Sequence, residues 1–191
     1  MARKVFKAII ISVLIAILAI GTVGCEKATE EEAVSLVKDL VSRSYELNVI
    51  YYGEGLKYKD SGNPNDLYMV VYEQEKYILK SQLTKATREV FSESFATSII
   101  DMSFNGVQSQ INQNSVQPRY MTQIDDDLIY VNKAYEPVVS GEIAKYNYDT
   151  IEITKISRRF IEARIKTTSG QTVNVTLIKE DNGWRLDSGT Y

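Results

Sequence analysis

FIEARIKTTSGQTVNVTLIKEDNGWRL, residues 160–186, is the stretch that decides the fold. Apolar and polar side chains alternate along two runs within it, and the apolar positions are Ile161, Ala163, Ile165, Val173, Val175 and Leu177. Ser169-Gly170 and Asn182-Gly183 separate the runs, and Asn-Gly is the strongest short signal of a β-hairpin. A period of two with tight turns predicts an antiparallel meander that has one dry and one solvated face.

Other segments of strand character lie upstream of this stretch. Together with the two runs they give predicted strands at residues 119–123, 128–132, 150–156, 160–167, 172–178 and 184–186. Residues 67–72 are rich in β-branched and aromatic side chains, which predicts either another strand or an apolar plug over the core. Residues 53–65 hold three glycines and an Asn-Pro pair, so they are expected to form a loop.

Two amphipathic helices are expected ahead of the meander. Thr29 and Glu32 have the spacing of a capping box, and apolar residues follow at helical spacing to about Ile50. A second helix is predicted from Ser81 to Met102, with Thr84 as its cap. Helices first and a meander last predict an α+β domain whose helices cover the dry face of the sheet.

Two polar segments are candidates for binding. Residues 105–119 carry several amides and no charge before Arg119, which suits either a binding loop or a solvated excursion. The run Asp125-Asp126-Asp127 is a candidate calcium ligand set, but it lacks the alternating spacing of a calcium loop and is predicted to be a solvated turn.

The first 24 residues have the pattern of a lipoprotein signal peptide. Basic residues open the chain, an apolar run follows from Ala8 to Ile20, and small residues precede Cys25. We therefore expect export, cleavage after Gly24, and acylation of Cys25, with residues 25–32 as a short tether and residues 33–191 as one domain. Thr22 stands where a larger aliphatic residue is usual, and the alternatives are cleavage by the ordinary signal peptidase or an uncleaved anchor.

Composition removes several classes of function. The 191 residues include no histidine and one cysteine, so Ser-His-Asp and Cys-His catalysis and histidine-ligated metal sites are excluded, and no metal or cofactor is expected. After the leader, 19 basic and 25 acidic residues give a net charge of −6, which disfavours nucleic acid as a partner. The 13 tyrosines suit a binding surface, although packing on the core explains most of them equally well.

Three stretches carry a resemblance to a known family. They are an opening helix that runs into Tyr51-Tyr52, the residues 79–83 with 90–96, and the ending Asn-Gly-Trp-Arg-Leu-Asp-Ser at 182–188. In these the chain resembles the bacterial DL-endopeptidase inhibitors of the IseA type and, more loosely, cystatin- and NTF2-like domains. Ser92 stands where that family often has Thr, and the amide-rich segment replaces a shorter turn.

The resemblance implies a cystatin/NTF2-like α+β domain on the outer face of a Gram-positive cell membrane. It implies a protein that is not an enzyme and that binds NlpC/P60-type peptidoglycan hydrolases and blocks their active-site cleft. The expected contacts lie in the amide-rich segment and just after it: Gln108, Gln110, Asn112, Gln113, Asn114, Arg119 and Tyr120. Two alternatives remain, a lipoprotein that binds a small ligand or supports the envelope, and a carboxylate-dependent enzyme.

Overall fold

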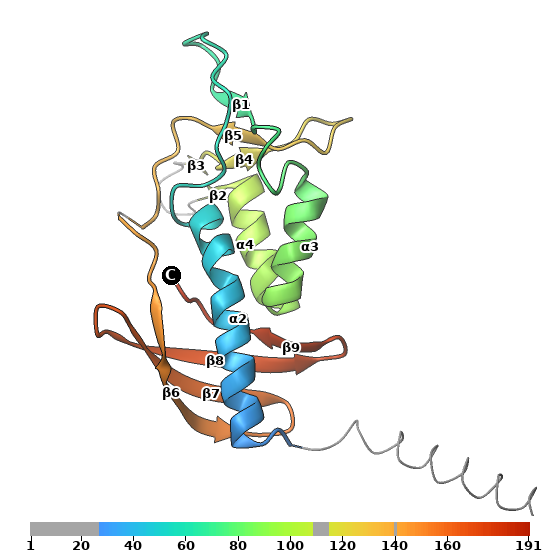
Figure 1. Ribbon diagram of the computed structural model, residues 1–191. Coiled ribbons are helices and arrows are strands. Elements are labelled where there is room, and N and C mark those ends of the chain that lie inside the picture. The colour runs from blue at the N-terminus through green and yellow to red at the C-terminus, as the bar shows by residue number, and fades with distance from the viewer. Residues whose placement is uncertain (1–26, 109–114, 140) are drawn as a thin grey trace, which may run out of the picture.

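The fold is built around one long helix, as a computed structural model that describes residues 27–108, 115–139 and 141–191 shows (Figure 1). This helix, α2, spans Glu30–Tyr51. Thr29 and Glu32 form the predicted capping box, in which each side chain accepts a hydrogen bond from the other residue's backbone N–H. The helix ends where the N–H of Gly55 bonds to the carbonyl of Val49, so both predicted boundaries are confirmed.

The C-terminal meander forms a four-stranded antiparallel sheet. Its strands are β6 (Tyr146–Ile156), β7 (Phe160–Thr167), β8 (Thr172–Glu180) and β9 (Gly183–Leu186), in the order β6-β7-β8-β9. Ile161 pairs with Leu177 and Ala163 with Val175, and all four side chains are buried. The N-terminal half of α2 lies across this sheet (Figure 1), so the predicted α+β class, with a helix on the dry face, is confirmed.

The segment predicted as one second helix is two helices. α3 spans Lys80–Val90 and α4 spans Glu93–Asn105, so the prediction of a continuous helix over 81–102 was wrong. Phe91 is extended between them, and the N–H of Ser92 donates to the carbonyl of Leu186 in β9 at 2.7 Å. The break exists because this stretch of chain adds a short parallel bridge to the edge of the sheet, between Phe91 and Leu186.

The predicted cap of the second helix was also wrong. Thr84 lies inside α3, and the first turn of that helix is satisfied by other residues. The side chain of Gln82 accepts from the N–H of Leu79, and Asp127, from a distant connection, accepts from the N–H groups of Lys80 and Ser81. A cap that lies 46 residues away in sequence leaves no local signal.

A second, smaller sheet lies at the other end of α2. Its strands are β1 (Tyr68–Val70), β5 (Tyr130–Asn132) and β4 (Tyr120–Met121), in the order β1-β5-β4. The strand predictions for 67–72, 119–123 and 128–132 are confirmed, with shorter bounds. A separate hairpin pairs β2 (Val107–Gln108) with β3 (Ser115–Val116). No described helix is both long and apolar enough to cross a bilayer.

Candidate functional site

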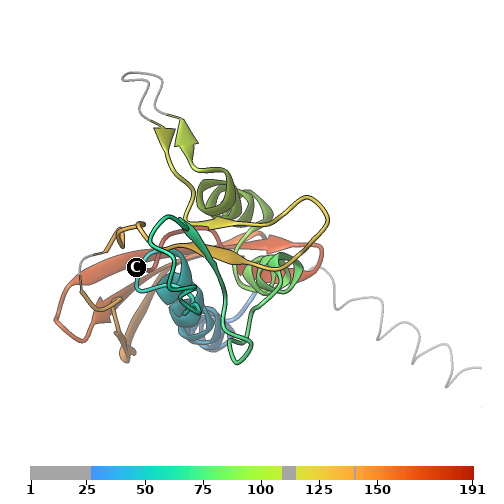
Figure 2. The same cartoon turned by 90° about the horizontal axis from the view of Figure 1, so that it is seen from above.

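The end of the molecule that carries the small sheet is the candidate binding surface. We call it the distal end and define it as the sheet β1-β5-β4, the β2–β3 hairpin, and the connections 59–67 and 122–127. α2 starts beside the four-stranded sheet and points its C-terminus at the distal end (Figure 1). Viewed along that direction, the hairpin and the connection between β4 and β5 project away from the body on different sides (Figure 2).

The structure describes three of the residues predicted to contact a partner: Gln108, Arg119 and Tyr120. Gln110, Asn112, Gln113 and Asn114 lie outside the described residues, as does the predicted lipidation site Cys25. Gln108 lies in β2, opposite Ser115 in the hairpin. Arg119 and Tyr120 are 3% and 0% exposed, so the expectation that they contact a partner is corrected: both belong to the core.

Arg119 is buried because its guanidinium hydrogen-bonds to carbonyl groups at and just beyond the C-terminus of α2. Its guanidinium donates to the carbonyl of Tyr51 at 3.1 Å and to the carbonyl of Gly53 at 2.7 Å. It also lies over the rings of Tyr120 and Tyr135, with its Cζ 5.6 and 5.1 Å from their centroids. A cation is favoured at the negative end of the helix dipole, and aromatic faces replace part of its lost hydration. Arg119 therefore fixes the distal end to the helix.

Tyr120 completes the same junction. Its hydroxyl donates to the carbonyl of Ile50 at 2.7 Å and accepts from the N–H of Leu56 at 3.2 Å. Burial raises the pKa of Tyr120 to about 12, against a smaller opposing effect of Arg119. A neutral hydroxyl with both bonds satisfied is a structural tie between α2, the loop that follows it and β4.

The connection between β4 and β5 forms a hydrogen-bonded turn, as predicted for the aspartate run. The N–H of Asp126 bonds to the carbonyl of Gln123, and Ile124 and Asp125 are the exposed central residues. Ile124 is not among the predicted contacts. Its only signal in the sequence is an isoleucine inside an otherwise polar connection, Thr-Gln-Ile-Asp-Asp-Asp at 122–127. Within the described residues, no group of three side chains of the His, Cys, Asp and Glu types is placed to hold a metal.

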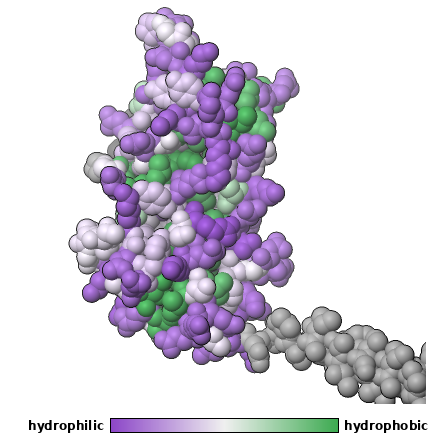
Figure 3. Space-filling view, viewed as in Figure 1, coloured by the Kyte–Doolittle hydropathy of each residue, from purple (hydrophilic) through white to green (hydrophobic). Residues whose placement is uncertain are grey.

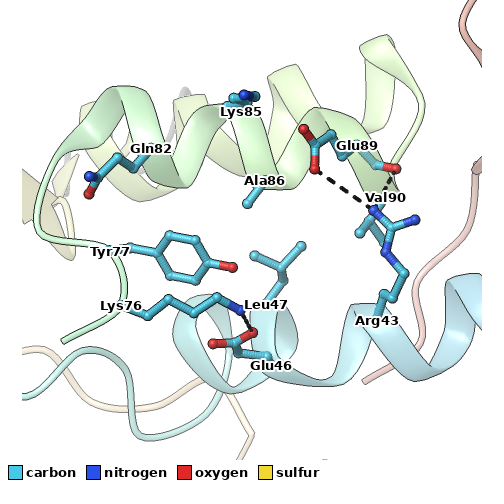
Figure 4. A pocket seen from close by; sticks show the side chains of 10 residues that line it. All are labelled: Arg43, Glu46, Leu47, Lys76, Tyr77, Gln82, Lys85, Ala86, Glu89 and Val90. Atoms are coloured by element: carbon cyan, nitrogen blue, oxygen red, sulfur yellow. Dashed lines mark hydrogen bonds and ion pairs between the residues drawn. The ribbon is translucent and has the colours of Figure 1, made fainter.

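A groove of about 510 Å³ between α2 and α3 is lined by charged residues at its rim and by apolar ones such as Leu47 and Val90 (Figure 4). Lys76 donates to Glu46 at 2.5 Å, and Arg43 lies 3.9 Å from Glu89. The hydrogen bond to Glu46 raises the pKa of Lys76, which keeps the amine protonated. A nucleophilic lysine needs the opposite shift, so Lys76 is an ion-pair partner of Glu46 in this groove.

Two further hollows are open grooves on the outside of the fold. One, of about 690 Å³, runs between the C-terminal half of α2 and residues 136–145, over a floor that includes Val49 and Ile143. The other, of about 580 Å³, lies between Lys38 of α2 and the start of β6, beside Tyr148. On the face of the molecule seen in Figure 1, the space-filling view shows apolar residues as separate patches among hydrophilic ones (Figure 3).

In comparison with known proteins, no protein-family model matches the chain, and no curated protein matches it at a significant level.

Proposed function

We propose that this chain is an exported lipoprotein, anchored through Cys25 to the outer face of the cell membrane, that binds a secreted DL-endopeptidase of the NlpC/P60 type and inhibits it. The inhibition is steric and requires no reaction by the inhibitor. The observation that carries the proposal is the position of the distal end: its projecting connections lie at the opposite end of α2 from the residues that follow Cys25 (Figure 1).

The length of α2 sets the reach of the tethered domain. The helix begins at Glu30, five residues after Cys25, and has 22 residues. At about 1.5 Å per residue it is roughly 33 Å long. A short tether at one end of the helix and a contact surface at the other would hold that surface clear of lipid headgroups and within the cell wall, where such hydrolases act.

Charge and composition support a binding role. A chain without histidine lacks the side chain that most often serves as a general base near neutral pH, whereas a steric inhibitor needs only a complementary surface. The expected net charge of −6 after the leader favours association with a basic partner, because opposite net charges raise the rate of encounter.

The test is digestion of purified peptidoglycan by the host's own DL-endopeptidases. Residues 26–191 in micromolar excess should slow the release of peptide fragments in a dose-dependent way. A muramidase acting on the same peptidoglycan is the control, and its rate should not change. Equal DL-endopeptidase rates with and without the domain would refute the proposal.

The anchor is tested separately. Radiolabelled palmitate should label the wild-type chain in cells, and a Cys25→Ala variant should be unlabelled and released into the medium. A wild-type chain that takes up no palmitate would show that the tether is wrong, whatever the domain binds.

A further inference from the structure

Ile124 is the most exposed large apolar side chain among the described residues. Its relative exposure is 101%, whereas the others that are exposed lie between 40% and 60%. Single apolar residues are common on protein surfaces. The central positions of tight turns, however, are usually occupied by Gly, Pro, Asn, Asp or Ser, and a β-branched residue there gains nothing from the turn itself.

The turn that presents Ile124 is fixed from within. Asp126 closes it, because its N–H donates to the carbonyl of Gln123 at 3.2 Å while its carboxylate accepts from the N–H of Leu128 at 2.8 Å. The hydroxyl of Tyr130 donates to the second oxygen of the same carboxylate at 3.4 Å. Asp127 in turn caps α3. Asp126 and Asp127 therefore both have structural roles, and Asp125 is the aspartate without one in the turn.

The turn is also fastened to the body of the domain. The carbonyl of Asp127 accepts from the N–H of Lys80 at 2.9 Å, and the N–H of Ile129 donates to the carbonyl of Ile78 at 2.9 Å. These bonds join the connection to the first residue of α3 and to the residues just before that helix, in addition to its strands in the small sheet. Ile124 is therefore carried at the tip of a turn that has little freedom to lose when a partner binds.

Resting on the proposed function, we infer that Ile124 is the apolar anchor by which this domain enters its target. The anchor fits a protein that has an apolar pocket with basic groups at its rim, because the exposed carboxylate of Asp125 adjoins Ile124. Full burial of an isoleucine side chain in such a pocket strengthens binding by about 10- to 100-fold. The low ordering cost of the turn allows most of that gain to appear in the affinity.

A lipid surface is the competing occupant, and two features disfavour it. The turn lies at the distal end, away from the start of α2 (Figure 1). The three consecutive aspartates beside Ile124 are repelled by anionic headgroups. A protein pocket with basic residues at its rim satisfies both Ile124 and the exposed carboxylate of Asp125.

The experiment measures the inhibition constant of residues 26–191 against a purified host DL-endopeptidase. Ile124→Asp should raise the constant by about tenfold or more, and Ile124→Val should keep it within about threefold, since it retains most of the apolar side chain. Val138→Asp is the matched control: Val138 is also exposed, on the connection before β6 that lies on the other side of the molecule (Figure 2), and this variant should inhibit like the wild type. All three variants should keep the wild-type melting temperature.

Three results would overturn the inference, and they are distinguishable. Wild-type inhibition that Ile124→Asp leaves unchanged removes the anchor and leaves the proposed function intact. Absence of inhibition by the wild-type domain removes the proposed function, and the anchor with it. Binding of the wild-type domain to vesicles rich in phosphatidylglycerol that is lost in Ile124→Asp assigns the residue to lipid instead.

Discussion

The guanidinium of Arg119 fills the space in which Gly55 would carry a side chain. A Cβ on Gly55 would lie 2.2 Å from Nη2 and 2.8 Å from Cζ of Arg119, and Gly55 has a φ of +85°. Gly55→Ala should therefore lower the free energy of unfolding by about 2–4 kcal/mol, from the clash and the left-handed backbone together. Urea denaturation at pH 7 measures the change.

Gly62 is the matched control for this prediction. It also has a positive φ, of +75°, but a Cβ there would meet nothing within 4 Å. Gly62→Ala should cost only about 1 kcal/mol, which is the backbone contribution alone. Equal losses in the two variants would show that Arg119 does not depend on the absence of a side chain at Gly55.

A second prediction concerns the guanidinium itself. Arg119→Lys keeps the charge but loses the fork that reaches the carbonyls of Tyr51 and Gly53 together. It should reduce the free energy of unfolding by about 2–3 kcal/mol, because a buried carbonyl is left without a donor. The exposed pair of Arg88 with Glu93 is the comparison, and Arg88→Lys should change stability by less than about 0.5 kcal/mol. A mild effect at Arg119, no larger than at Arg88, would contradict this account of the junction.

The predicted role of Arg119 shows where the sequence misleads. An arginine that follows a run of amides suggests a surface contact, and no local pattern indicates that residues 66 and 68 positions earlier will accept from it. Burial of a lone guanidinium depends on a helix end and aromatic faces that come together only in the folded chain. By contrast, α2 and the meander were predictable, because capping, alternation and turn residues act within a few positions of one another.

A third prediction concerns the break between α3 and α4. The Ser92 hydroxyl caps α4, accepting from the N–H of Phe95 at 3.2 Å, and donates to the carboxylate of Asp187 at 2.5 Å. Ser92→Ala should lower the free energy of unfolding by about 1–2 kcal/mol. Ser98, exposed in the middle of α4, is the control, and Ser98→Ala should lie within about 0.5 kcal/mol of the wild type. If Ser92→Ala left the free energy of unfolding unchanged, the Ser92 cap would not be what maintains the break between α3 and α4.

The same break explains the error in helix prediction. Residues 81–102 have apolar side chains at helical spacing throughout, so periodicity alone favours one helix. Ser92 is a good N-cap residue in the middle of that pattern. It becomes an N-cap only because the carbonyl of Leu186 in β9 accepts a hydrogen bond from its N–H and holds the chain extended there. The small sheet was missed as a unit for a related reason, since β1 pairs with β5 across some 60 residues of sequence.

A fourth prediction follows from Tyr120. Its pKa is raised to about 12 by burial, above the value of about 10 in an unfolded chain. Below pH 10 the hydroxyl is neutral in both states and its stabilising effect is complete. Between pH 10 and 12 the unfolded chain ionises first, so the free energy of unfolding should fall, by up to about 3 kcal/mol from this group.

The Tyr120→Phe variant separates this group from the other titrating side chains. At pH 7 it should be about 1–2 kcal/mol less stable, because the carbonyl of Ile50 and the N–H of Leu56 lose their partner. Between pH 10 and 12 its stability should decline less steeply than that of the wild type. Burial also raises the pKa of Tyr51 and Tyr52, so some decline persists in the variant. Parallel pH curves for the two proteins would refute the assignment.

We propose that this domain acts by binding a hydrolase and not by chemistry of its own. Isothermal titration of residues 26–191 into a purified host DL-endopeptidase tests it most directly. We expect saturable binding of one domain per enzyme with a dissociation constant in the micromolar range or tighter, weakened by added salt as for an acidic protein and a basic partner. A titration without heat of binding, repeated at low salt and at a second temperature, would contradict it.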